Sequence, residues 1–186
     1  MPNQNMTPEI KEKIRNRIRS IPDYPKPGIL FRDITTLLKH PDGIQDSVKV
    51  LSKKLLNIEF DKIAAIDSRG FIFGAALSFS LGKGFVPVRK KNKLPGEVIR
   101  EEYKLEYGYD EMELHTDAIE EGERVLLIDD LIATGGTALA AMKLIQRLGG
   151  DVVACAFILG LPEIGGMKKL AESGFKVITI CDFEGH

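Results

Sequence analysis

The chain has 186 residues, of which 44% are hydrophobic and 28% charged, and its formal net charge is −1. This length predicts a single domain over residues 1–186, and the near-neutral charge argues against nucleic acid as a partner, because such proteins usually need a strong basic excess. The N-terminal residues contain no apolar core of signal-peptide length, and no run reaches the roughly 18 apolar residues of a membrane span, so we expect a cytoplasmic protein with no membrane partner.

The first predicted helix begins at Thr7, a residue type that favours the N-cap position. Its apolar stripe recurs at every fourth residue: Ile10, Ile14 and Ile18. We expect this helix to end before Pro22. Residues 22–33 are rich in Pro and Gly and predict an irregular loop. A second amphipathic helix is predicted over residues 43–56.

Short apolar runs alternate with helical patterns over the rest of the chain. The predicted strands are residues 62–67, 85–89, 125–128, 151–159 and 175–181, and the predicted helices are residues 70–81, 138–148 and 164–172. This alternation predicts an α/β fold with a doubly wound, mostly parallel sheet flanked by helices. Cys155 and Cys181 lie inside two of the predicted strands, and their spacing suits neither a metal nor a redox pair, so we expect buried, reduced thiols.

Residues 94–118 depart from this rhythm. Tyr103, Leu105 and Tyr107 alternate with charged or small residues, which is typical of a half-exposed antiparallel pair or of a flap. We therefore expect this region to lie outside the parallel part of the sheet.

The segment Val125–Thr137, VLLIDDLIATGGT, carries the strongest functional signal. Asp129 and Asp130 are predicted to end a buried strand, at the edge where open α/β sheets bind their ligands. Carboxylates at that edge accept hydrogen bonds from sugar hydroxyls, each contributing roughly 1.5–3 kcal/mol. The Gly135-Gly136 pair lets the backbone approach an anion, and the next helix adds the positive end of its dipole. The segment therefore predicts a ribose-phosphate site, which both carboxylates can reach only if the strand has ended.

A similar turn follows another predicted strand: Asp67-Ser68-Arg69-Gly70. Ser68 can cap the next helix, and Arg69 offers a planar fork to a phosphate, although the turn by itself fits an exposed arginine equally well. Residues 89–93, RKKNK, follow a third strand, and a basic run is by itself typical of a solvated loop. The two glycine-containing turns together favour an anion site, because pyrophosphate and 5′-phosphate each need one.

The segment Val125–Thr137 closely resembles the phosphoribosyl-pyrophosphate signature of the type I phosphoribosyltransferases, and it is not a Walker A loop. Three further runs resemble the adenine-specific members of that family, in the right order and at suitable separations. They are PGILFRD at residues 27–33, DSRG at residues 67–70 and KLEYG at residues 104–108. The likeness covers the chain from about Ile10 to Ile180. It implies the family's fold, with a small hood at residues 1–35 and a flexible flap at residues 94–118.

The resemblance also assigns each candidate site residue to a part of the substrate. The ribose and 5′-phosphate would contact Asp129, Asp130, Ala133, Thr134, Gly135, Gly136 and Thr137. The pyrophosphate would contact Asp67, Ser68, Arg69, Arg89, Lys90 and Lys93, with a strained non-proline peptide, of the kind that can be cis, expected within residues 67–70. The base would contact Leu30, Arg32 and Leu131, Glu106 would be the catalytic residue, and Tyr107 would belong to the flap.

The reaction implied by the resemblance joins adenine to 5-phosphoribosyl 1-pyrophosphate (PRPP), giving AMP and pyrophosphate in purine salvage. Mg²⁺ would be held mainly by substrate oxygens and water, with no dedicated protein metal site. Glu106 would accept the proton from N7 of adenine, while Leu30 and Leu131 clamp the base and backbone groups near Arg32 read its amino edge. The family also suggests a homodimer.

Three alternatives remain open. The same fold could use hypoxanthine, xanthine or orotate in place of adenine. A regulator could sense the phosphoribosyl ligand without catalysis, although a sensor needs no proton acceptor such as Glu106. A phosphoacceptor receiver domain also has an Asp pair at a strand end, but on its first strand and without a Gly-Gly turn after it.

Overall fold

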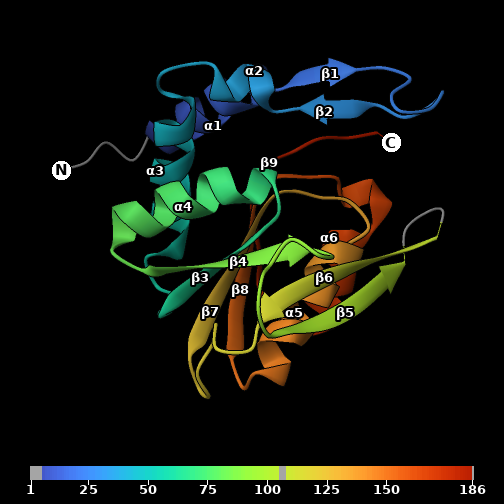
Figure 1. The fold of residues 1–186 in the computed structure, drawn as a ribbon. Coiled ribbons are helices and arrows are strands. Elements are labelled where there is room, and N and C mark those ends of the chain that lie inside the picture. The colour runs from blue at the N-terminus through green and yellow to red at the C-terminus, as the bar shows by residue number, and fades with distance from the viewer. Residues whose placement is uncertain (1–5, 105–107, 186) are drawn as a thin grey trace.

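The structure, a computed structural model, describes residues 6–104 and 108–185. Within these residues seven strands form one sheet, in the spatial order β5-β6-β4-β3-β7-β8-β9 (Figure 1). The strands are β3 (Lys62–Ile66), β4 (Gly84–Lys90), β5 (Val98–Lys104), β6 (Tyr109–His115), β7 (Arg124–Ile132), β8 (Asp151–Gly160) and β9 (Val177–Asp182). Neighbouring strands are parallel along the run β4-β3-β7-β8-β9. Strand β6 pairs antiparallel with β4, and β5 pairs antiparallel with β6. The predicted α/β fold with a mostly parallel sheet is confirmed.

Helices cover both faces of this sheet, as a doubly wound fold requires (Figure 1). They are α1 (Met6–Asn16), α2 (Thr35–Leu38), α3 (Gly43–Leu55), α4 (Arg69–Leu81), α5 (Gly136–Arg147) and α6 (Gly166–Glu172), with a short 3-10 turn, η1, at Pro162–Ile164. Helices α1, α3 and α4 pack on one face and α5 on the other. Among the described residues no helix is long and apolar enough to cross a membrane.

The central strand β7 separates two hydrophobic cores. Leu126 and Ile128 pack into the core beneath α3 and α4, whereas Val125 and Leu127 pack into the core beneath α5. Alternate side chains of a strand point to opposite faces of the sheet. Because both faces are buried at β7, every residue from 125 to 128 is apolar. Cys155 and Cys181 are both buried free thiols, as expected.

The chain order of the parallel strands reverses between β3 and β7. From β3 the chain proceeds to β4 on one side, and β7, β8 and β9 follow on the other side. In open α/β sheets this reversal opens a crevice at the carboxyl ends of the two strands. The turn after β3 is residues 67–68, which lead into α4, and the turn after β7 is residues 133–135, so both candidate loops of the sequence meet at this crevice.

The N-terminal segment differs from its sequence-based prediction. Helix α1 ends at Asn16, and a strand that was not expected, β1 (Arg19–Ile21), follows it. It pairs antiparallel with β2 (Phe31–Asp33), inside the segment predicted as an irregular loop. The Pro- and Gly-rich composition describes the connection between the two strands but not their pairing, because strands of three residues are too short to show an alternating apolar pattern. This small hairpin lies apart from the main sheet (Figure 1).

Strands β5 and β6 form the antiparallel pair that the alternating pattern predicted. Strand β6 also pairs with β4 through Arg89 and Glu113, so the hairpin extends the main sheet. Leu105 and Tyr107 of the predicted alternation lie outside the described residues.

Strand β7 continues beyond its predicted end. Asp129 and Asp130 were expected to terminate it, but β7 runs to Ile132 because β8 still pairs with it at Asp129 and Leu131. On its other side, pairing with β3 stops at Ile128. The predicted strand end is therefore wrong for the side of β7 that pairs with β8. It is right for the side that pairs with β3, where the crevice opens.

Candidate active site

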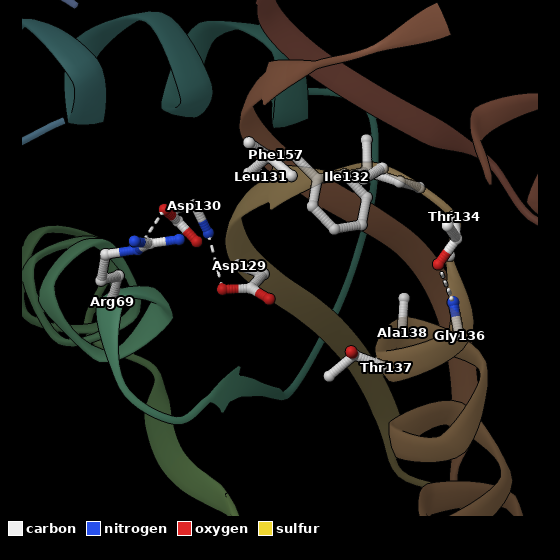
Figure 2. A pocket seen from close by; sticks show the side chains of 12 residues that line it. Arg69, Asp129, Asp130, Leu131, Ile132, Thr134, Gly136, Thr137, Ala138 and Phe157 are labelled. Carbon is white, nitrogen blue, oxygen red and sulfur yellow. Dashed lines mark hydrogen bonds and ion pairs between the residues drawn. The ribbon is translucent and has the colours of Figure 1, made fainter. Parts of the chain in front are cut away.

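The loop from Ala133 to Thr137, here called the signature loop, borders a cavity of about 210 Å³. This signature cavity is lined by every signature residue from Asp129 to Thr137, together with Arg69, Ala138 and Phe157. Gly135 has a left-handed backbone with φ of 77°, which a residue with a Cβ rarely adopts. The hydroxyl of Thr134 lies 3.5 Å from the amide of Gly136, at the start of α5 (Figure 2). The loop and the helix N-terminus thus present backbone amides to one space, as an anion requires.

The outer side of the signature loop packs tightly against α6. The amide of Gly166 donates a hydrogen bond of 2.9 Å to the carbonyl of Ala133. A Cβ on Gly166 would lie 2.2 Å from that carbonyl oxygen and 2.6 Å from the amide nitrogen of Gly135. Sequence reasoning missed Gly166, although the GG pair at residues 165–166 was a visible signal. This packing fixes the loop from behind, so its open side faces the cavity.

Asp129 and Asp130 both line the signature cavity although they are adjacent on a strand. The amide of Asp130 donates to the carboxylate of Asp129 at 2.8 Å, and Arg69 Nε lies 2.6 Å from Asp130 Oδ2 (Figure 2). Burial, and next the charge of Asp130, raise the pKa of Asp129 well above its ordinary value. The pair therefore resists carrying two negative charges, and a neighbouring positive charge relieves this repulsion.

The turn after β3 lies directly across the crevice. The Asp67–Ser68 peptide is cis, which agrees with the expectation for this turn. Ser68 takes the N-cap position of α4, but its side chain makes no capping hydrogen bond among the described residues. A Cβ on Gly70 would lie 2.9 Å from Asp129 Oδ1, so this glycine allows a close approach of β7 and α4.

A second cavity of about 650 Å³, here called the basic cavity, lies beside this turn. It collects all six residues that were assigned to pyrophosphate: Asp67, Ser68, Arg69, Arg89, Lys90 and Lys93. Arg89 Nε donates to Asp67 Oδ2 at 3.2 Å, and the Arg89 guanidinium lies 5.9 Å from the centre of the Phe71 ring. The cationic groups of this cavity can bind a multiply charged anion.

Two residues of the hairpin also line the basic cavity and were missed by the sequence assignment: Tyr103 and Asp110. They face each other across β5 and β6, and the Tyr103 hydroxyl donates to Asp110 Oδ2 at 3.1 Å. Burial and the neighbouring Asp110 raise the pKa of Tyr103 to about 12, so it is a neutral hydrogen-bonding group at physiological pH. Their cross-strand pairing was the signal, and it is readable only once the hairpin register is known.

The signature cavity and the basic cavity share a wall. Arg69, Asp129, Asp130 and Thr137 line both of them. The carboxylates of Asp129 and Asp130 would therefore lie between an anion bound in the signature cavity and an anion bound in the basic cavity. A ligand with a phosphate at each end and a polyhydroxyl ring between them matches this order of groups.

The residues assigned to the base are divided between two elements. Leu131 lines the signature cavity, next to the acid pair. Leu30 and Arg32 flank Phe31 on the N-terminal hairpin, and Arg69 lies 5.6 Å from the centre of the Phe31 ring, so the hairpin contacts the site through Arg69. The Arg32 side chain is 8% exposed and turns to the C-terminal tail, where it donates to the carbonyl of Glu184 at 2.8 Å. Burial lowers the pKa of Arg32, with a further contribution from Arg15.

Glu106 and Tyr107 lie outside the described residues. Tyr103 of β5 lines the basic cavity. The roles assigned to both residues stay predictions.

Comparison with known proteins agrees with this geometry. The family model described as the phosphoribosyl transferase domain matches residues 33–184. An adenine phosphoribosyltransferase of Chlorobium chlorochromatii is 58% identical over 174 residues, which cover 92% of this chain and 98% of the relative. The chain belongs to the adenine phosphoribosyltransferase family.

Solved structures of this family have the same fold. The crystal structure of an adenine phosphoribosyltransferase from Thermoanaerobacter pseudethanolicus matches with a TM-score of 0.90 and 49% identity, covering 93% of this chain and 99% of that one. The enzyme of Saccharomyces cerevisiae, solved with an imino-altritol bisphosphate and adenine, matches with a TM-score of 0.86 and 35% identity over 93% of this chain and 99% of its own. The phosphoribosyltransferase fold predicted from the sequence is confirmed.

Proposed function

We propose that this protein transfers the phosphoribosyl group of PRPP to adenine, releasing pyrophosphate and forming AMP in purine salvage. The observation that carries the proposal is the shared wall between the two cavities, formed by the acid pair. PRPP has the same order of groups: a 5′-phosphate, a ribose and a pyrophosphate. The yeast relative was solved with adenine and a bisphosphate, which supports the same ligand classes here.

In this proposal the amides of the signature loop and of the α5 N-terminus bind the 5′-phosphate. The loop residues would be Ala133, Thr134, Gly135, Gly136 and Thr137. The helix dipole adds a favourable interaction with the phosphate of roughly 0.3–1 kcal/mol. The pyrophosphate would lie in the basic cavity, among Ser68, Arg69, Arg89, Lys90 and Lys93.

Asp129 and Asp130 would accept hydrogen bonds from the ribose hydroxyls. Because Arg69 now pairs with Asp130, PRPP binding would exchange that ion pair for a contact of Arg69 with pyrophosphate. As the bond from C1 to the pyrophosphate oxygen breaks, the sugar gains positive charge. Burial and the charge of Asp130 raise the pKa of Asp129, and the sugar cation would relieve the repulsion between the two carboxylates, so the acid pair stabilises the transition state more than the ground state.

Adenine must lose a ring proton when its nitrogen attacks C1. Glu106 remains our candidate to accept that proton at N7, a role that typically contributes roughly 10²- to 10⁴-fold to the rate. Leu30 and Leu131 would clamp the two faces of the base, and backbone groups near Arg32 would read its amino edge. Residues 94–107, including Tyr107, would close as a lid over the site and exclude water from the sugar cation.

The site fits a requirement for Mg²⁺. Asp129 and Asp130 supply the oxygen donors that this ion prefers, and one or two carboxylates with substrate phosphates form its usual ligand set at phosphate sites. When bound, Mg²⁺ neutralises charge on the departing pyrophosphate. We propose that substrate oxygens and water provide most of its ligands, without a dedicated protein metal site.

We propose a single domain over residues 1–186, with the hood at residues 1–35 and the flap at residues 94–118, and a homodimeric, cytoplasmic enzyme, as in the family. The proposed partners are adenine and PRPP, with no nucleic acid and no membrane.

The deciding experiment measures pyrophosphate release with PRPP and Mg²⁺ in the presence of adenine, hypoxanthine or guanine. We expect release with adenine alone among the three, loss of turnover with excess chelator, and recovery when Mg²⁺ is added back. Preference for hypoxanthine or guanine would keep the fold and replace the substrate. Binding of PRPP without turnover on any base would favour a phosphoribosyl sensor.

A further inference from the structure

Glu113 is a fully buried carboxylate that the proposed reaction does not use. It lies on β6 with 0% exposed surface. Its Oε1 accepts hydrogen bonds from the backbone amides of Lys93 and Leu94, each at 2.6 Å. Its Oε2 lies 3.3 Å from Nε of Arg100 on β5. Burying a charge without such partners is costly, so this cluster of bonds needs an explanation.

These bonds keep the carboxylate ionised. Burial opposes ionisation of Glu113, but hydrogen bonds from the amides of Leu94, Lys93 and Asn92 and from Arg100 outweigh it and lower its pKa. The groups that face Glu113 are therefore three successive amides of one turn and one guanidinium. An ionised carboxylate accepts stronger hydrogen bonds than a neutral one.

The turn held by Glu113 belongs to the basic cavity. Lys93 lines that cavity, and its carbonyl accepts a hydrogen bond of 3.2 Å from Arg89, which lines it too. Arg89 in turn donates to Asp67 at the cis turn. A continuous series of bonds thus links the buried carboxylate, the backbone of Lys93, the guanidinium of Arg89 and the turn after β3.

We propose that Glu113 is a positioning residue for the pyrophosphate end of PRPP. It anchors the backbone of the turn at residues 92–94, and through that turn it fixes Lys93 and Arg89 toward the basic cavity. The inference rests on the proposed function for the identity of the anion. It adds a residue on β6, remote in sequence from the signature and from the basic run, that determines affinity for pyrophosphate and not for the base.

The test compares Glu113→Ala with Glu113→Gln and with a matched control, Glu111→Gln. Glu111 lies two residues away on the same strand and forms an ion pair of 3.0 Å with Lys91, whose side chain is 53% exposed. The Lys91 end of this pair is exposed to solvent, and neither residue lines the signature cavity or the basic cavity, so we expect the control to behave like the parent chain. Glutamine at position 113 keeps an acceptor for the turn amides but loses the charge.

We expect Glu113→Ala to raise the KM for PRPP, and the Kd for inorganic pyrophosphate measured by calorimetry, by about tenfold or more, the loss of one charge-assisted hydrogen bond. The KM for adenine should change by less than about twofold, since the base contacts no part of this series of bonds. Glu113→Gln should recover part of the affinity. Melting temperatures of all variants identify those that fold.

Equal losses for PRPP and adenine, or unchanged pyrophosphate binding in a folded variant, would overturn the proposal. If Glu113→Ala does not fold, the same comparison with Glu113→Gln decides. Pyrophosphate binding is read without turnover, so a parent chain that binds pyrophosphate but does not react with adenine would contradict the proposed function and leave this test intact.

Discussion

At the scale of single residues, the missing Cβ of two glycines controls the signature loop in two different ways. A Cβ on Gly166 would overlap the backbone at Ala133 and Gly135, whereas a Cβ on Gly136 would have its nearest heavy atom, the carbonyl oxygen of Lys104, at 3.5 Å. Gly166 is thus required by the packing behind the loop. Gly136 is tolerant in packing and lines the cavity at the start of α5.

We therefore expect Gly166→Ala to destabilise the protein by about 1–3 kcal/mol, the usual cost of overpacking, and to weaken PRPP binding. Gly136→Ala should retain the melting temperature and raise the KM for PRPP, because its methyl group stands beside the amides that receive the phosphate. Thermal unfolding and initial rates of both variants check this. Equal stability of the two variants would contradict the packing described for α6.

At the scale of elements, the C-terminal tail supports the N-terminal hairpin. The Phe183 ring lies 4.5 Å from the guanidinium of Arg32 and 5.1 Å from that of Arg15. The Phe183 amide donates to the carbonyl of Gly160 at 3.0 Å, which ties the tail to the end of β8. Because Arg32 belongs to β2, the tail fixes the strand that we assign to adenine.

Removal of the ring by Phe183→Ala should raise the KM for adenine about twofold to thirtyfold, from the loss of roughly 0.5–2 kcal/mol of cation–π interaction, and leave the KM for PRPP nearly unchanged. Phe183→Tyr keeps the ring and should behave like the parent chain. Steady-state kinetics below the melting temperature of each variant measure both constants. A selective loss for PRPP would show that the tail does not act on the base-binding strand.

At the scale of the whole molecule, the two buried thiols couple stability to alkaline pH. Burial raises the pKa of both Cys155 and Cys181 to about 12, from an ordinary value of 9.0. Above pH 9 the unfolded chain loses these protons while the folded chain retains them, so the unfolded state binds fewer protons. The contribution of the two protonated thiols to the free energy of unfolding is complete below pH 9 and is lost as pH rises toward 12.

We expect the free energy of unfolding in urea to fall between pH 9 and pH 12, and to fall less in a Cys155→Ala, Cys181→Ala double variant that lacks both groups. Alkylation by iodoacetamide at pH 8.5 should be slow in the native protein and rapid in urea, because the thiolate is the reactive form. Native thiols that react as fast as those of the unfolded chain would refute their burial.

The helices and strands whose bounds were predicted correctly are those with a clear apolar pattern in consecutive residues. Helices α3 and α4 and strands β3 and β8 begin and end within one or two residues of their predicted bounds, because apolar periodicity is written into consecutive residues. The hairpin of β1 and β2 and the extension of β7 to Ile132 were missed. Both depend on pairing with a strand elsewhere in the chain, which local patterns do not contain.

By itself the sequence determined the chemistry of the site: an acid pair before a Gly-Gly turn, a second turn with an arginine, and a basic run. Each of these signals lies within a few consecutive residues, so composition and spacing suffice to read it. Only the tertiary structure decided that the turns after β3 and β7 share one crevice, that α6 closes the signature loop from behind, and that Glu113 holds the basic turn. These relations join residues far apart in the chain, and they exist because strand order and packing, rather than local propensity, set which segments become neighbours.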